Sequence, residues 1–201
     1  IEGSRNINVT KTIELTLSLL KKNIFVVFLS SVEVFSGKKS KYEINEVPDP
    51  VSAYGKLKVE TEYALKELGQ HIAVIRLTKV FDKESSIAGK WIRYLQNGIA
   101  INAFNDIHIS PISLGYAAEF IITIGERQEP GTYHLSGDED YSYYDIATML
   151  AKRAFSTATV SGVPAHVEMP SYASLSMRQN KNGEQFAPQC INSVLESLFS
   201  D

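Results

Sequence analysis

The sequence IFVVFLSS at residues 24–31 carries more information about the fold than any other part of the chain. Its first six residues are apolar without polar alternation, which predicts a strand buried on both faces of a parallel sheet. A helix is predicted to follow at residues 52–68, closed by Gly69, before a second buried strand at residues 71–77. This strand, helix and strand order predicts an α/β fold.

Further helices and strands are predicted on either side of this unit. Val9, Ile13, Leu17 and Leu20 recur at helical spacing and predict a helix that ends before the first strand. Later helices are predicted at residues 90–96, 113–126, 142–153 and 191–199, and later strands at residues 99–101 and 131–135. The boundary between a sheet-forming half and a smaller, more irregular half is expected near residues 80–90.

Composition and charge argue against several classes of function. The 201 residues carry a formal net charge of −3 and a pI near 5.9, so no basic surface is expected to attract nucleic acid or a membrane. No apolar run reaches the ~18 residues that cross a bilayer, and residues 1–5 do not resemble a signal peptide. We therefore expect a cytoplasmic protein that acts on small molecules.

The cysteine and histidine content predicts no metal site. Cys190 is the single cysteine, so an internal disulfide is excluded. The four histidines lack close ligand spacing and stand at positions His71, His108, His134 and His166.

Tyr54 and Lys58 are four residues apart, one turn on the predicted helix, so they share a face. The charge of Lys58 would favour the phenolate and lower the pKa of Tyr54 from its usual value near ~10. Ser31 ends the first strand, so one reacting carbonyl could meet a phenol, an ammonium and a hydroxyl. The alternative is a surface pair with stacked side chains, because this spacing also arises by chance.

The order of these motifs resembles the extended short-chain dehydrogenase/reductase superfamily, and within it the NAD-dependent epimerase/dehydratase enzymes of nucleotide sugars. The similar segments are LSSVEVFSG at 29–37, a proline-bearing loop at 45–50, YGKLKVE at 54–60 and VIRL at 74–77. DIHISPIS at 106–113 is most like the dTDP-4-dehydrorhamnose reductase type. The chain departs from the reductase pattern at Val32-Glu33, where Asp-Tyr is usual.

This resemblance implies a partial Rossmann-like parallel sheet with a smaller C-terminal substrate lobe. Residues 1–85 would form the C-terminal part of an NAD(P)-binding domain, and residues 86–201 mostly the substrate lobe, with some segments returning to the sheet. Such domains open with a glycine-rich turn that holds the cofactor pyrophosphate, and nothing in the sequence matches it. The N-terminal cofactor-binding part is therefore expected to be missing.

The resemblance also implies roles for individual residues. Tyr54 would be the acid/base, Lys58 would bind the nicotinamide ribose, and Ser31 would hydrogen-bond the substrate oxygen. Tyr54, Lys58 and Ser30 are the expected contacts of the cofactor, NADP or NAD. The expected substrate contacts are Ser31, Phe35, Ser110 and Arg178. For Ser31 the alternative is a strand-end hydroxyl that bonds only to the backbone.

The implied function is NAD(P)-dependent reduction of the keto group of a nucleotide-linked sugar, in polysaccharide biosynthesis. Two alternatives stay open: a nucleotide-sugar epimerase or dehydratase, and a noncatalytic truncated member that acts as a binding or regulatory protein. The resemblance further implies a homodimer formed through the helices at about residues 8–22 and 52–68.

Overall fold

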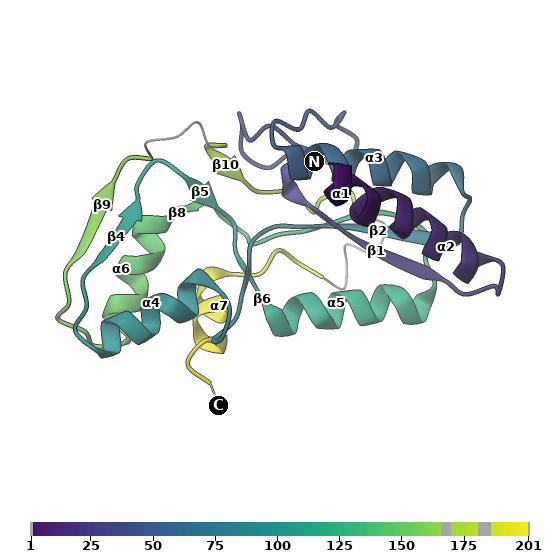
Figure 1. Cartoon of the computed structure of the whole chain (residues 1–201). Coiled ribbons are helices and arrows are strands. Elements are labelled where there is room, and N and C mark those ends of the chain that lie inside the picture. The colour runs from purple at the N-terminus through teal and green to yellow at the C-terminus, as the bar shows by residue number, and fades with distance from the viewer. Residues whose placement is uncertain (1, 166–169, 181–185, 201) are drawn as a thin grey trace.

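A computed structural model describes residues 2–165, 170–180 and 186–200. Two lobes lie side by side, and the chain passes between them several times (Figure 1). One lobe contains a parallel sheet with helices on both faces, and the other contains short strands and three helices. The predicted α/β fold with parallel strands is confirmed.

The central sheet has the strand order β1-β2-β7, with β1 (Val26–Ser31), β2 (Ile72–Leu77) and β7 (Gly131–Leu135) all parallel. Ser30 pairs in register with Arg76, and Arg76 pairs with His134. The carboxyl ends of the three strands therefore meet at one edge of the sheet, where α/β folds commonly place their functional residues.

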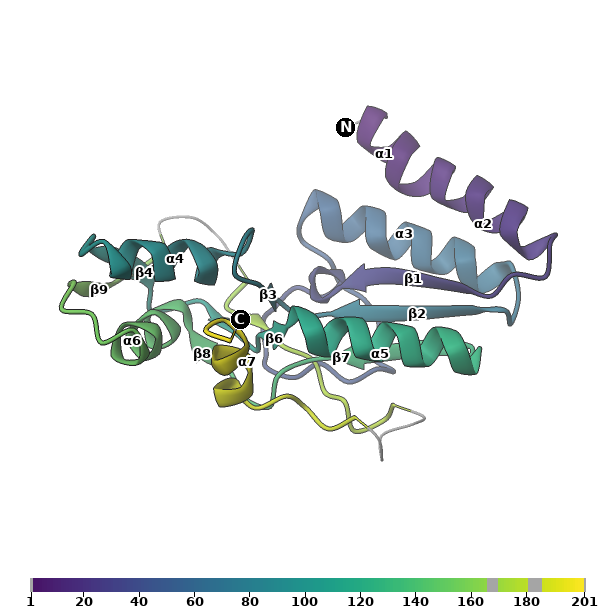
Figure 2. The same ribbon diagram turned by 90° about the horizontal axis from the view of Figure 1, so that it is seen from below.

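Helices cover both faces of this sheet. α1 (Glu2–Arg5), the π-helical segment η1 (Asn6–Lys11) and α2 (Thr12–Leu20) form one continuous helical stretch beside α3 (Ala53–Glu67). Figure 2 shows α3 on one side of β1 and β2, and α5 (Leu114–Arg127) on the other. The predicted helix at residues 52–68 is confirmed to within a residue at each end.

The prediction that the first strand is buried on both faces is wrong. Among its six residues only Ser30 is buried, and Leu29 is 40% exposed. The reason is that β1 lies at the edge of the sheet and pairs only with β2 in the described part of the chain. β2 has neighbours on both sides, and its residues 72–76 are buried as predicted.

The second lobe is built around a separate apolar core. α4 (Ile87–Gln96), α6 (Tyr143–Arg153) and α7 (Ile191–Ser197) supply most of its buried side chains. A parallel pair of strands, β4 (Ile101–Phe104) and β9 (Val160–Val163), lies against α6. Shorter strands form two further small sheets. In one, β3 (Val80–Phe81) pairs with β6 (Ile112–Ser113); in the other, β5 (His108–Ile109) lies between β8 (Tyr141–Ser142) and β10 (Tyr172–Ala173).

Serine residues fix where the helices begin. Ser52, Ser86, Ser113 and Ser142 each precede a helix, and each side chain accepts a hydrogen bond from the backbone N–H three residues later. Such a cap satisfies a donor that the helix itself leaves unpaired. No helix in the described ranges has both the length and the apolar character needed to cross a membrane.

Candidate functional site

The site predicted from the sequence lies where β1 ends and α3 begins. β1 runs directly into the short 3-10 helix η2 (Val32–Val34), and the Ser31 hydroxyl accepts a hydrogen bond from the Glu33 N–H at 3.2 Å. Ser52 starts α3 by accepting the Gly55 N–H at 2.9 Å. These two turns place Ser31 and the first turn of α3, which carries Tyr54, at the same end of the sheet.

Lys58 connects α3 to β1. Its ammonium donates to the Leu29 carbonyl at 2.7 Å and lies 4.6 Å from the centre of the Phe28 ring. The same nitrogen is 5.5 Å from the centre of the Tyr54 ring. Tyr54 is 45% exposed, and its hydroxyl has no hydrogen-bond partner among the described residues. The phenol is therefore free to meet a ligand.

The prediction that Lys58 lowers the pKa of Tyr54 is wrong for this structure. Burial raises the pKa of Tyr54 above its ordinary value, and the nearby Glu33 carboxylate raises it further. The pKa of Lys58 is lowered by burial, which outweighs the opposing effect of Glu62. The ammonium of Lys58 is directed to the Leu29 carbonyl, so at neutral pH the phenol holds its proton.

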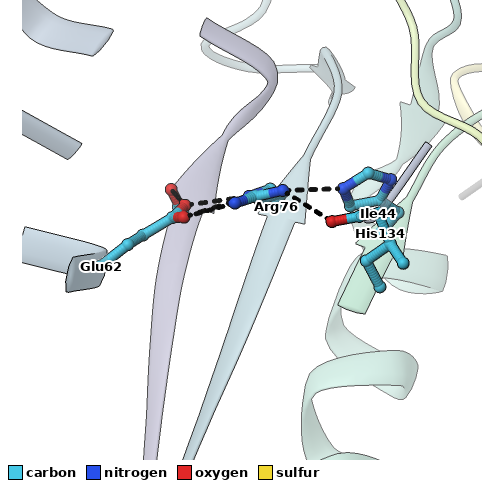
Figure 3. Close-up of polar contacts among 5 residues, drawn as sticks. Ile44, Glu62, Arg76 and His134 are labelled. Carbon is cyan, nitrogen blue, oxygen red and sulfur yellow. Dashed lines mark hydrogen bonds and ion pairs between the residues drawn. The ribbon is translucent and has the colours of Figure 1, made fainter. Parts of the chain in front are cut away.

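A buried polar network crosses the sheet from Glu62 on α3 through Arg76 on β2 to His134 on β7 (Figure 3). Arg76 donates to Glu62 through Nη2 at 2.7 Å and through Nε at 3.1 Å, and both side chains are buried. On its other side Arg76 Nη1 lies 3.5 Å from the Ile44 carbonyl and 3.3 Å from His134 Nε2. The Ser30 hydroxyl donates to Glu62, so a cofactor contact by this hydroxyl would compete with that bond.

Sequence reasoning missed Glu62 and His134. A signal for Glu62 was present, since Arg76 in a strand predicted to be buried requires a carboxylate partner. Glu62 also stands four residues after Lys58, on the same face of the helix. The pairing with His134 could not be found in this way because it depends on the register of β2 with β7.

The expected substrate contacts are dispersed and differ in exposure. Phe35 is buried and stacks on Tyr42, with 4.4 Å between the ring centres, so contact with a substrate would require this stack to open. Ser110 is buried, and its hydroxyl donates to the Glu139 carbonyl at 2.7 Å. The Arg178 side chain is exposed. Substrate contact by these three residues stays a prediction.

A cavity of about 430 Å³ lies in the second lobe. Its wall combines aromatic rings, two lysines and an amide, contributed among others by Lys79, Lys90, Trp91, Tyr94, Asn102, Phe104 and Tyr143. Lys79 follows β2 by two residues, and β2 ends at Leu77, which pairs in register with Ser31. One lining residue of the cavity therefore comes from the segment that follows the carboxyl end of β2.

The described residues include no group of three His, Cys, Asp or Glu side chains that could hold a metal ion. Cys190 is exposed. His166 lies outside the described residues.

A family model for the RmlD substrate binding domain matches residues 2–200. The dTDP-4-dehydrorhamnose reductase of Aggregatibacter actinomycetemcomitans is 26% identical over 172 residues, which are 82% of this chain and 58% of that protein. Methionine adenosyltransferase 2 subunit beta of Xenopus laevis is 27% identical over 137 residues, 63% of this chain and 41% of that protein. The chain thus spans about half the length of these relatives.

Solved structures show the same fold. A dTDP-4-dehydrorhamnose reductase from Bacillus anthracis str. Ames, in complex with NADP, has a TM-score of 0.88 at 21% identity and covers 98% of this chain and 74% of its own. The UDP-glucose 4-epimerase of Thermotoga maritima has a TM-score of 0.82 at 14% identity, and the match covers 96% of this chain and 68% of that one. Because the family model matches nearly the whole chain, the chain belongs to the RmlD substrate binding domain family, a branch of the short-chain dehydrogenase/reductases.

Proposed function

We propose that the chain provides the proton-transfer site of an NAD(P)-dependent reductase that acts on the keto group of a nucleotide-linked sugar. The observation that carries this proposal is the exposed Tyr54 phenol beside the half-buried Lys58, at the end of β1 that also holds Ser31. Membership of the RmlD substrate binding domain family and the reductase relative support the same reaction class.

In this proposal Tyr54 is the general acid. Its raised pKa keeps the phenol protonated at neutral pH, so it can donate a proton to a carbonyl oxygen as that oxygen gains negative charge. The Ser31 hydroxyl accepts from the Glu33 N–H, which leaves its own proton to donate to the same oxygen. Lys58, whose ammonium donates to the Leu29 carbonyl, acts at the cofactor instead.

The residues present fit the nicotinamide end of a dinucleotide. Lys58 uses one of its donors on the Leu29 carbonyl, and the other two can bind ribose hydroxyls. Bound NADPH or NADH would supply the hydride to the carbonyl carbon. The sequence contains no Gly-x-x-Gly-x-x-Gly turn for the pyrophosphate, so the proposal assigns only the nicotinamide end to these residues.

We further propose that the nucleotide part of the substrate occupies the cavity of the second lobe. Partly buried aromatic rings such as Tyr94 and Phe104 suit a base, and Lys79 and Lys90 suit a diphosphate. The position of Lys79 just after β2 would bring the diphosphate between the cavity and Ser31.

Replacing Tyr54 tests the proposal. With a 4-keto sugar nucleotide and NADPH, the rate of NADPH oxidation is expected to fall about 10²–10⁴-fold in Tyr54→Phe, because the variant lacks the general acid. Tyr63→Phe is the matched control, since Tyr63 is an exposed tyrosine on the same helix. Equal rates in wild type and Tyr54→Phe, or no turnover by folded wild-type chain, would contradict the proposal.

A second candidate is a noncatalytic subunit of another enzyme. The observation in its favour is that several relatives of similar identity are named as methionine adenosyltransferase 2 subunit beta. Such a protein would bind a methionine adenosyltransferase catalytic subunit equally well with and without Tyr54→Phe, and would not oxidise NADPH. Sedimentation of the mixed proteins, beside the turnover assay, distinguishes the two candidates.

A further inference from the structure

Glu33 links the two turns that form the candidate site. It lies in η2, directly between Ser31 and the loop that leads to α3. Its Oε2 accepts the Ser52 hydroxyl at 2.7 Å, and the Ser52 oxygen in turn accepts the Gly55 N–H at 2.9 Å. The carboxylate of Glu33 is therefore hydrogen-bonded to Ser52, which caps α3, the helix that carries Tyr54.

The backbone of Glu33 contacts the same two turns. Its N–H donates to the Ser31 hydroxyl at 3.2 Å. Its carbonyl oxygen is so close to α3 that a Cβ atom on Gly55 would lie 2.0 Å from it. Since Gly55 follows Tyr54 directly, the main chain at residue 33 packs against the first turn of α3.

Two charged groups among the described residues act near the Tyr54 phenol. Glu33 approaches from η2, and Lys58 lies on the same helix as Tyr54. Lys58 donates to the Leu29 carbonyl, whereas the Glu33 carboxylate raises the pKa of Tyr54 in addition to the effect of burial. A carboxylate beside a phenol disfavours the phenolate because like charges repel.

We infer that Glu33 is a positioning residue of the candidate site, which holds Ser31 and the first turn of α3 together and places a negative charge beside the phenol. This inference rests on the proposed function for its catalytic meaning. The charge lowers the fraction of phenolate further, so Tyr54 enters the reaction as the protonated phenol that reduction of a carbonyl requires. The cap itself does not need the charge, because Ser52 supplies the hydrogen bond to the helix.

The Glu33→Gln variant separates charge from hydrogen bonding. Glutamine retains an oxygen that accepts the Ser52 hydroxyl but removes the negative charge. We expect the midpoint of Tyr54 ionisation to fall to lower pH, measured by NMR of protein with ¹³C at the tyrosine Cζ. The Tyr54 resonance is identified by its loss in Tyr54→Phe.

Two further variants control this experiment. Glu67→Gln removes the same charge at the exposed far end of α3 and should leave the Tyr54 midpoint unchanged. Glu33→Asp retains the charge, so its Tyr54 midpoint should stay close to the wild-type value. An unchanged midpoint in Glu33→Gln, or equal midpoints in Glu33→Asp and Glu33→Gln, would overturn the inference.

The titration needs no substrate or cofactor, so it can fail or succeed independently of the proposed function. If the chain does oxidise NADPH with a keto-sugar nucleotide, the alkaline limb of its kcat profile is also expected to move to lower pH in Glu33→Gln. If the NMR midpoint of Tyr54 falls but the alkaline limb of the kcat profile stays at the same pH, the charge acts on the phenol but not on catalysis, and only the catalytic claim is overturned.

Discussion

Arg76 shows how one buried charge constrains its neighbours. The residues before it in β2 are buried and apolar, and a guanidinium in such surroundings must be paired with a carboxylate and bonded at its remaining donors. Glu62 supplies the carboxylate through bonds to Nε and Nη2. Nη1 points to His134 Nε2, so this nitrogen is an acceptor and the ring is neutral. His134 Nδ1 carries the proton and donates to the Ser176 carbonyl at 3.0 Å.

This pairing predicts that His134 weakens the fold at acid pH. Burial, with help from Arg76, lowers the pKa of His134 from 6.5 to about 3. Below pH 6.5 the unfolded chain binds a proton that the folded chain does not, so stability is lost as the pH falls from about 6.5 towards about 3. Between pH 7 and pH 5 this loss amounts to about 2 kcal/mol.

Urea unfolding of wild type and His134→Asn at both pH values measures this effect. Asparagine retains an acceptor and a donor but does not titrate. Between pH 7 and pH 5 the free energy of unfolding of the variant should therefore fall by about 2 kcal/mol less than that of wild type. The same pH dependence in both proteins would show that His134 titrates normally in the folded chain.

At the scale of elements, the contact between η2 and α3 leaves no room for a side chain at Gly55. A Cβ atom there would meet the backbone of Glu33, which cannot rotate away as a side chain could. We therefore expect Gly55→Ala to lower the free energy of unfolding by about 1–3 kcal/mol and to disturb the Ser31–Tyr54 geometry.

Gly115→Ala is the control for this prediction. Gly115 lies in α5 with open space where its Cβ would be, so alanine should stabilise the helix by up to about 1 kcal/mol. Denaturant unfolding of the two variants gives the comparison. A destabilisation of similar size in both variants would mean that the close contact with Glu33 does not matter.

Elements with local signals were predicted well, and those that depend on distant partners were not. The helices that begin after Ser52, Ser113 and Ser142 have their caps and apolar spacing in the sequence itself. The strand β9 was missed because its four residues acquire their structure from β4, about 60 residues earlier in the chain. The exposure of β1 likewise depends on which strand lies beside it.

The candidate site likewise combines residues that local sequence signals select with a contact that only the fold reveals. The Ser31, Tyr54 and Lys58 positions follow from a strand end and helical spacing, so the sequence was sufficient to select them. The effect of Glu33 on Tyr54 requires knowing that η2 packs against the first turn of α3. Without that contact the charge of Lys58 appeared to be the main influence on the phenol.

At the scale of the whole molecule, exposed apolar side chains occur on the helices that the sequence analysis expected in a homodimer. Ile7 and Leu15 are 67% and 61% exposed on the N-terminal helical stretch, and Tyr63 is 52% exposed on the neighbouring α3. These two helical segments contact each other (Figure 1). Apolar side chains on adjacent helices are typical of an interface between protein copies.

We expect wild-type chain to sediment as a dimer and Leu15→Glu to sediment as a monomer, because a buried unpaired carboxylate is costly at an interface. Ile122→Glu is the control, since Ile122 is also exposed but lies on α5, across the sheet. A monomeric wild type, or dissociation caused by Ile122→Glu instead, would contradict this interface.

The order in which the chain builds the sheet has a consequence for its synthesis. β7 lies next to β2, yet residues 78–130, including much of the second lobe, separate the two strands in the sequence. During synthesis β2 therefore lacks its second neighbour until β7 has left the ribosome. The second lobe begins to form while the sheet is still incomplete. Residues 1–85 cannot complete this sheet alone, so the two lobes are expected to fold as one cooperative unit.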